Sequence, residues 1–277
     1  MALLVLLTCS GCGDVISNPS PLPAQQAISS STPSDGGSIQ SADTVMFCLD
    51  STNTYDRDLF RSALNFAADG IDALVRPREQ RIVFYFSAIT ANSYSTDNDL
   101  LTVSIPIIAG PPEPPVYATA VNPYGSAEKT AVAEDNKRRE EIYQQALEEY
   151  QRHVGGVKKA LAERTAALRH LNPGVDTGGS DNYGCIARAA DRFQESTGKH
   201  VLILATDLLG IGPQQDREIV NLNGASVSVI FYPSKYATDN QYRMDLWRGY
   251  FQLNGAERVT FYDTAQSQII TLDDLFK

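Results

Sequence analysis

The chain has 277 residues, of which 43% are hydrophobic and 20% charged, and its 23 basic and 33 acidic side chains give a formal net charge of -10. This composition excludes a fibrous or wholly disordered protein. The acidic excess argues against nucleic acid as a partner, because phosphate contacts need clustered Lys and Arg. With three histidines in the whole chain, a His-rich zinc site or a His-based catalytic triad is not expected.

The amino terminus resembles the end of a bacterial lipoprotein signal. An apolar run at 2–8 is too short to span a bilayer, and Gly11 precedes Cys12 as a small residue precedes the lipidated cysteine of such signals. The resemblance implies a signal-like segment at 1–12, a lipid anchor on Cys12 and an extracytoplasmic, membrane-anchored location at the bacterial cell envelope. The alternative is an apolar terminus without a targeting role, because no Lys or Arg occurs before Arg57.

Residues 13–43 are predicted to form a disordered tether. Ser, Pro, Gly, Gln and Ala dominate this stretch, which has too few large apolar residues to offset the entropy lost on ordering. Behind a lipidated cysteine, the tether would hold a folded domain, residues 44–277, some tens of ångströms from the membrane.

From residue 44 onward, the predicted elements alternate between strands and helices. Six apolar runs are typical of strands: 44–49, 81–87, 100–108, 200–206, 226–232 and 258–262. The run at 100–108 contains a proline, which suits an edge strand joined to 81–87 by a hairpin. Apolar residues at helical spacing predict three helices: 59–74, 185–196 and 239–253. This order predicts an α/β fold, a doubly wound, mostly parallel sheet covered on both faces.

A long charged tract interrupts that alternation and is predicted as a helical insertion at about 111–172. After a Pro-rich piece, its apolar residues recur mostly every three or four positions, as in a coiled coil: Tyr143, Leu147, Tyr150, Val154, Val157, Leu161, Leu168 and Leu171. Because Gly155 and Gly156 lie in the middle of the tract, three shapes are possible: a kinked helix, a helical hairpin or one straight rod. The tract either packs on its own domain or projects as a partner-binding arm.

Two cysteines, Cys48 and Cys185, lie in the predicted folded part. In an oxidising compartment they could form a disulfide. Two buried free thiols are the alternative, because sequence spacing alone does not bring two Cα atoms within disulfide range.

Three polar clusters lie where predicted strands end or a predicted helix begins. They are Asp50-Ser51-Thr52-Asn53-Thr54, Thr177-Gly178-Gly179-Ser180-Asp181 and Thr206-Asp207. Ligands of doubly wound sheets bind at the carboxyl ends of the strands, near the point where strand order reverses. The three clusters are therefore expected to converge at one edge of the sheet.

The order of these clusters resembles the von Willebrand factor A-type (vWA) domain with its metal-ion-dependent adhesion site (MIDAS). That family's Asp-x-Ser-x-Ser motif appears here as Asp50-x-Thr52-x-Thr54. Its helix entry, Gly-Gly-Thr-Asn/Asp, resembles 178–181, with Ser180 in the place of the threonine and Thr177 as the alternative. Its Thr-Asp element resembles 206–207, and the glycine that usually follows is Leu208 in this chain.

The resemblance implies a divalent metal held by Asp50, Thr52, Thr54, Ser180 and Asp207. Mg²⁺ is the expected ion, with Mn²⁺ and Ca²⁺ as alternatives, because these cations prefer oxygen ligands. Two carboxylates and several neutral hydroxyls leave such an ion attracted to a further carboxylate. The resemblance thus implies a protein partner that supplies an acidic side chain, and a binding module rather than an enzyme.

Two other readings compete with metal-dependent binding. A haloacid-dehalogenase-type phosphatase would use Asp50 as nucleophile in an Asp-x-Asp-x-Thr motif, but Thr52 replaces the second aspartate, which acts as the general acid. A structural envelope lipoprotein would keep the fold without its ion and act through the helical insertion.

Overall fold

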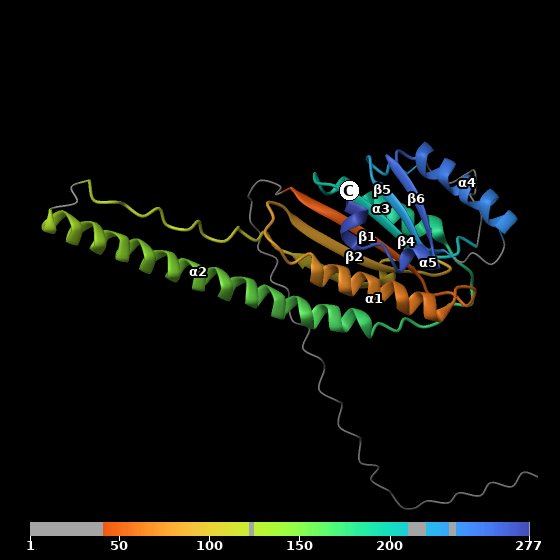
Figure 1. Cartoon of the computed structure of the whole chain (residues 1–277). Coiled ribbons are helices and arrows are strands. Elements are labelled where there is room, and N and C mark those ends of the chain that lie inside the picture. Colours follow the sequence, from red (N-terminus) through yellow and green to blue (C-terminus); the bar gives the residue numbers. More distant parts are fainter. Residues whose placement is uncertain (1–40, 122–124, 210–219, 233–236, 277) are drawn as a thin grey trace, which may run out of the picture. The chain divides into compact units, whose positions relative to one another are not determined.

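The structure is a computed structural model that describes residues 41–121, 125–209, 220–232 and 237–276. The chain divides into two units, Met1–Ser38 and Ile39–Lys277. The signal-like segment, Cys12 and the tether up to residue 40 lie outside the described residues. All described helices and strands belong to the second unit (Figure 1).

Six strands form one sheet in the order β3-β2-β1-β4-β5-β6. Neighbours are parallel except β2 and β3, which pair antiparallel at one edge. This confirms the predicted α/β fold with a doubly wound, mostly parallel sheet and one antiparallel edge strand. The strands are β1 (Ala42–Asp50), β2 (Arg81–Ile89), β3 (Asp99–Ile105), β4 (His200–Ala205), β5 (Ser226–Tyr232) and β6 (Arg258–Asp263).

Several strand boundaries differ from the sequence prediction, and two of the differences have a clear physical reason. β1 begins at Ala42, inside the segment predicted as tether, because Ala42 already pairs with Arg81 of β2. β3 ends at Ile105 rather than 108, because Pro106 has no N–H to donate to a ladder.

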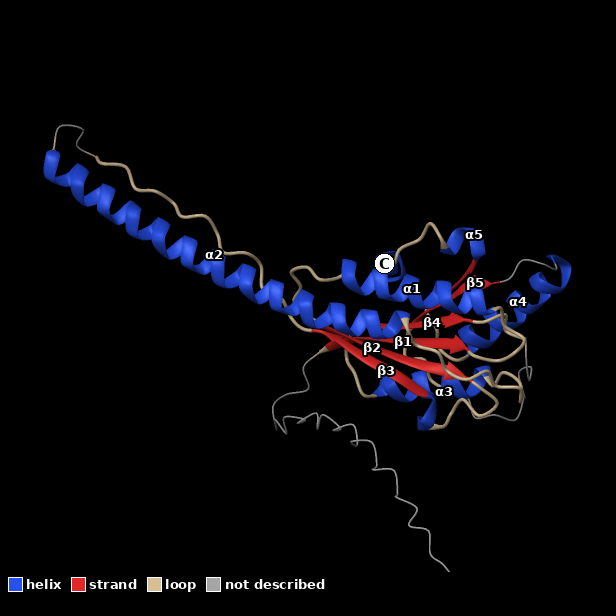
Figure 2. Ribbon diagram, turned by 90° about the horizontal axis from the view of Figure 1, so that it is seen from below, coloured by secondary structure: helices blue, strands red, loops and turns tan. Residues whose placement is uncertain are grey.

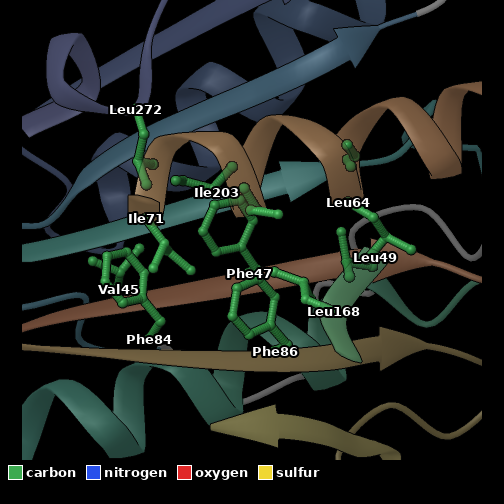
Figure 3. Close-up of a cluster of buried hydrophobic side chains, with 14 of the residues drawn as sticks. Val45, Phe47, Leu49, Leu64, Ile71, Phe84, Phe86, Leu168, Ile203 and Leu272 are labelled. Carbon is green, nitrogen blue, oxygen red and sulfur yellow. The ribbon is translucent and has the colours of Figure 1, made fainter. Parts of the chain in front are cut away.

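Helices cover both faces of the sheet (Figure 2). One face packs against α1 (Arg57–Ala73) and the carboxyl-terminal part of α2 (Ser126–Arg169), and the other against α3 (Asn182–Gln194) and α4 (Ala237–Leu253). Short helices complete the fold: η1 (Thr96–Asn98), α5 (Thr264–Ser267) and η2 (Leu272–Phe276). Figure 3 shows the core between the sheet and helices α1 and α2, where Phe47 and Phe86 from the sheet meet Leu64 and Ile71 from α1 and Leu168 from α2.

Helix α1 holds the loop after β1 in place. Its apolar residues at helical spacing are buried, namely Phe60, Ala63, Leu64, Ala67 and Ile71. The side chain of Asp56 caps the helix by accepting from the backbone N–H of Asp58 at 2.8 Å. The strand, polar loop and capped helix therefore form in the predicted order.

Helix α2 is one continuous helix of 44 residues, so the kink and the hairpin considered for Gly155 and Gly156 are wrong. Near its carboxyl end, Leu161, Thr165 and Leu168 are buried, because this part packs beside α1. The amino-terminal part projects beyond the sheet (Figures 1 and 2). The insertion therefore both packs on its own domain and projects from it. Within the described residues, no helix combines the length and the apolar character needed to cross a membrane.

The extended segment at 111–121, which precedes α2, runs along the projecting part of that helix (Figure 1). The side chain of Asn136 accepts from the backbone N–H of Ala118 at 2.8 Å and donates to its carbonyl at 2.9 Å. The Tyr117 hydroxyl donates to Glu140, and the backbone N–H of Val121 donates to Glu128 at 2.8 Å. The projection is thus a helix with an extended chain bonded along one side.

Cys48 of β1 and Cys185 of α3 form a disulfide with Cα atoms 6.1 Å apart. Both residues are fully buried in the core between the sheet and helices α3 and α4. Of the two alternatives considered from the sequence, the structure has the disulfide, because α3 crosses β1 at the level of Cys48.

Candidate metal centre

The candidate site lies at the carboxyl ends of the two central strands. Asp50 is the last residue of β1, and Thr206 follows the last residue of β4. Strand order reverses between these two neighbours, since β2 and β4 flank β1 on opposite sides. Ser180 precedes α3, whose first turn reaches the same edge. The topology thus brings three distant polar clusters together, as expected for a doubly wound sheet.

Hydroxyl groups surround the carboxylate of Asp50. The Thr52 hydroxyl donates to Oδ1 at 2.6 Å, and the Thr206 hydroxyl donates to Oδ2 at 2.7 Å. The Ser180 hydroxyl lies 3.4 and 3.3 Å from the two oxygens, and the backbone N–H of Thr52 donates to Oδ1 at 3.1 Å. Three segments of the chain therefore meet on one carboxylate.

The Thr52 hydroxyl oxygen is the centre of a second set of contacts. It shares hydrogen bonds with the hydroxyls of Thr54 at 2.9 Å and Ser180 at 2.8 Å. Thr52 and Ser180 are buried, whereas Thr54 is exposed. Thr54 therefore marks the side from which a ligand can approach.

Burial raises the pKa of the Asp50 carboxyl, while hydrogen bonds from Thr52, Thr206 and Ser180 oppose the shift. A carboxylate that is 1% exposed loses most of its hydration. Because the pKa remains raised, the hydroxyls replace that hydration only in part. The site therefore gains from any further positive charge beside Asp50.

Asp207 is the second carboxylate of the site. Burial raises its pKa to about 6, and the negative charge of Asp50 adds to the shift, so the two carboxylates sense each other. Asp207 Oδ1 accepts from the backbone N–H of Leu209 at 2.8 Å. Leu208 has φ of 54°, a left-handed conformation that favours glycine. The loop thus keeps a glycine-like turn although a leucine occupies the position.

Thr177, the alternative to Ser180, is exposed, whereas the Ser180 hydroxyl lies 3.4 and 3.3 Å from the two oxygens of Asp50. Ser180 is therefore the hydroxyl that the structure brings to the cluster. Asp181 serves as the N-cap of α3, where it accepts from the backbone N–H of Gly184 at 3.0 Å. Its carboxylate also accepts from the backbone N–H of Ser93 at 3.3 Å. Asp181 is therefore used to shape the helix entry.

Three contributors were not among the ligands predicted from the sequence. Thr206 supplies the shorter of the two hydroxyl contacts to Asp50 Oδ2, at 2.7 Å against 3.3 Å for Ser180. Asn182 is fully buried and accepts from Thr206 at 3.3 Å, and its Nδ2 has no hydrogen-bond partner among the described residues. Asp176 accepts from the backbone N–H of Gly178 at 2.7 Å and pairs through its backbone with Asn53 at 3.1 Å, which ties two of the clusters together. Of the three, only Thr206 could have been found from the sequence, because it directly precedes Asp207. The sequence carries no comparable signal for Asn182 or Asp176.

The donor set suits a small hard cation. In an octahedral shell with metal–oxygen distances of about 2.0–2.1 Å, neighbouring oxygens lie roughly 2.9 Å apart. The Thr52 hydroxyl lies 2.6 to 2.9 Å from oxygens of Asp50, Ser180 and Thr54. The same distances are those of the hydrogen bonds that join the cluster. The described residues contain no group of three or more His, Cys, Asp and Glu side chains suited to a metal.

Comparison of the sequence with protein-family models and with curated proteins gives no match. The vWA resemblance therefore rests on the motif residues and on their convergence at the sheet edge.

Proposed function

We propose that this chain is an extracytoplasmic, membrane-tethered binding module that recognises a protein ligand through a divalent metal. The observation that carries the proposal is the convergence of Thr52, Ser180 and Thr206 on the buried carboxylate of Asp50. These are hard oxygen donors at the end of the central strands, where doubly wound sheets bind ligands.

Five residues would hold the ion: Asp50, Thr52, Thr54, Ser180 and Asp207. Mg²⁺ is the proposed ion, with Mn²⁺ and Ca²⁺ as alternatives, and it would supply a positive charge that attracts an acidic side chain of the partner. Asp50 and Asp207 together balance the charge of such an ion only if both are ionised. If the charge is balanced only in part, the ion still attracts a third carboxylate, which the partner would supply. Exposed Thr54 lies where that third carboxylate would approach.

The disulfide supports an extracytoplasmic location. Disulfides persist in oxidising compartments and are rare in the cytosol, and Cys48–Cys185 joins the central strand to α3. This agrees with the lipoprotein-like amino terminus, on which Cys12 would carry the anchor.

A metal-free structural lipoprotein is the second candidate. It is favoured by the hydrogen bonds that already occupy both oxygens of Asp50, and by the long projection of α2. A phosphatase is less favoured, because a nucleophilic Asp50 would be 1% exposed and would lack an acidic residue at position 52.

Titration with Mg²⁺ while thermal unfolding is followed tests the metal site. With a dissociation constant of about 1 mM, about 10 mM Mg²⁺ stabilises the folded state by roughly 1.4 kcal/mol, which raises Tm by about 3–5 °C in a domain of this size. Asp50→Ala should abolish the rise, and Thr177→Val, an exposed change outside the cluster, should retain it.

The ligand is tested with an immobilised Asp-containing peptide and a matched Asn-containing peptide. Retention only on the Asp peptide, lost in EDTA and in Asp50→Ala, is the expected result. A Tm of the unchanged protein that Mg²⁺ does not raise would favour the metal-free structural protein.

A further inference from the structure

The projecting part of α2 carries a charged stripe that is not used within the chain. We call residues 126–156 of α2 the arm. Some ions of the arm are paired with neighbours, as Arg139 is with Asp135 at 2.8 Å and Lys137 with Glu141 at 3.9 Å. Four other charged side chains of the arm are exposed and form no ion pair among the described residues: Glu134, Arg138, Glu149 and Arg152.

These four ions lie on one face of the helix. Successive residues turn by 100°, so positions three and four apart share a face. The sequence of this face, which we call the stripe, is Ala131, Glu134, Arg138, Ile142, Gln145, Glu149, Arg152 and Gly156. All of these residues are exposed, and Ile142 is 60% exposed. The extended segment binds a different side, through Asn136 and Glu140, and leaves the stripe open.

The stripe is complementary to itself when two copies run antiparallel. A two-fold axis midway between residues 143 and 144 brings Arg138 of one copy opposite Glu149 of the other, since both lie equally far from the axis. Glu134 then lies within one residue of the level of Arg152. Each contact occurs twice, and no like charges face each other along the stripe. Ile142 lies close to the axis, where the two copies give the pair an apolar centre.

The glycine in the stripe has a role in this arrangement. A glycine inside a helix costs about 1 kcal/mol relative to alanine, and a Cβ at Gly156 would meet nothing within 4 Å in its own chain. On the same two-fold axis, Gly156 faces Ala131 of the second copy. Two small residues at each end of the overlap let the helices approach closely, as helix packing at about 8–10 Å requires.

We propose that two copies of the chain associate through the stripe as an antiparallel, two-fold symmetric helix pair. The second copy is the occupant because one surface supplies both halves of every contact, which is the property of an isologous interface. The overlap from 131 to 156 is about 40 Å long. With few apolar contacts, the dimer is weak and sensitive to salt, since exposed ion pairs are screened over about 10 Å at moderate ionic strength.

Sedimentation equilibrium of the full chain at low salt tests the pairing. We expect a reversible dimer that dissociates at high salt. Arg138→Glu and Glu149→Arg should each raise the dimer dissociation constant at least about tenfold, and the double variant should return it to within about threefold of the original. The two positions are about 16 Å apart along one helix, so this rescue requires contact between chains.

A second comparison uses adjacent glycines as matched variants. Gly156→Leu should weaken the dimer, whereas Gly155→Leu, turned by 100° out of the stripe, should not. Circular dichroism confirms that the helix is kept in each variant. A monomeric chain at low salt, a charge reversal without rescue, or equal effects of the two glycine variants overturns the proposal.

Discussion

At the scale of single residues, the carboxylate of Asp50 decides how the candidate site behaves. It is buried, its pKa is raised by that burial, and it is held by hydroxyls from three segments. A buried carboxylate remains acceptable only while its oxygens have donors. The hydroxyls therefore contribute to folding whether or not a metal binds.

Thr206→Val tests this contribution without a change of shape. It removes the hydroxyl that donates to Asp50 Oδ2, and leaving a charged acceptor without that donor should lower the free energy of unfolding by about 1–3 kcal/mol. Urea unfolding in EDTA measures the loss. The same substitution at exposed Thr177 should change stability by less than about 0.5 kcal/mol, and equal effects at both positions would show that the cluster is not stabilising.

The raised pKa of Asp207 predicts that the stability of the metal-free protein increases as the pH falls. This pKa of about 6 in the folded protein lies above the value in the unfolded chain, about 3.9, so the folded state binds more protons between these values. The metal-free protein should therefore gain about 1 kcal/mol from this group as pH falls from about 7 to about 5. Asp207→Asn, compared with the unchanged protein by urea unfolding across that range in EDTA, should lack this gain. Parallel pH profiles would contradict it.

At the scale of elements, the two ends of helix α2 are stabilised in different ways. Its carboxyl-terminal turns bury Leu161 and Leu168 in the core beside α1, so tertiary packing stabilises them. Its amino-terminal turns have mostly exposed side chains and rely on helix propensity, ion pairs and the extended segment. The uninterrupted helix through Gly155 and Gly156 is thus supported from both ends.

Leu168→Ala should show which end belongs to the folded core. Leu168 is fully buried, and truncation of such a leucine costs about 2–5 kcal/mol. Leu253→Ala, at a leucine that is 84% exposed, should cost less than about 1 kcal/mol. Chemical unfolding of both variants measures the difference, and a small effect at Leu168 would mean that this end of α2 does not pack as described.

At the scale of the whole molecule, the disulfide joins parts of the fold that are 137 residues apart in sequence. The bond links the central strand to α3, and hence the strand that ends in Asp50 to the helix that begins beside Ser180. The insertion lies within the loop that it closes. The disulfide therefore fastens the framework on which the two halves of the candidate site are built.

Removal of this bond should weaken the fold. Closing a loop of more than about 100 residues is worth up to about 4–5 kcal/mol in the chain-entropy model, with about 2–5 kcal/mol typical of native disulfides. We expect a loss in that range for Cys48→Ala/Cys185→Ala, measured by denaturant unfolding without reductant. Reductant should lower the stability of the unchanged protein and leave that of the double variant unaltered. A reductant effect on both would assign the loss to another cause.

Much of the fold could be predicted from the sequence, because apolar periodicity reports local burial directly. The runs at 44–49 and 226–232 lie in fully or mostly buried strands, and Asp56 caps α1 as its position indicates. The predicted length of β3 was too great, because the apolar pattern continues past Pro106, where the hydrogen-bonded ladder ends. The candidate site was predicted by the position of its motifs, but not Asn182 or Asp176, whose roles depend on neighbours far away in the sequence.

By itself, the sequence determined which segments become strands and helices and which oxygen-bearing residues lie at their ends, since those properties depend on neighbours along the chain. The tertiary structure alone decided three further matters: that Ser180 and not Thr177 reaches Asp50, that Cys48 and Cys185 are bonded, and that α2 runs straight through two glycines. Each depends on distances between segments far apart in sequence or on packing at a helix end, and periodicity carries no information about either.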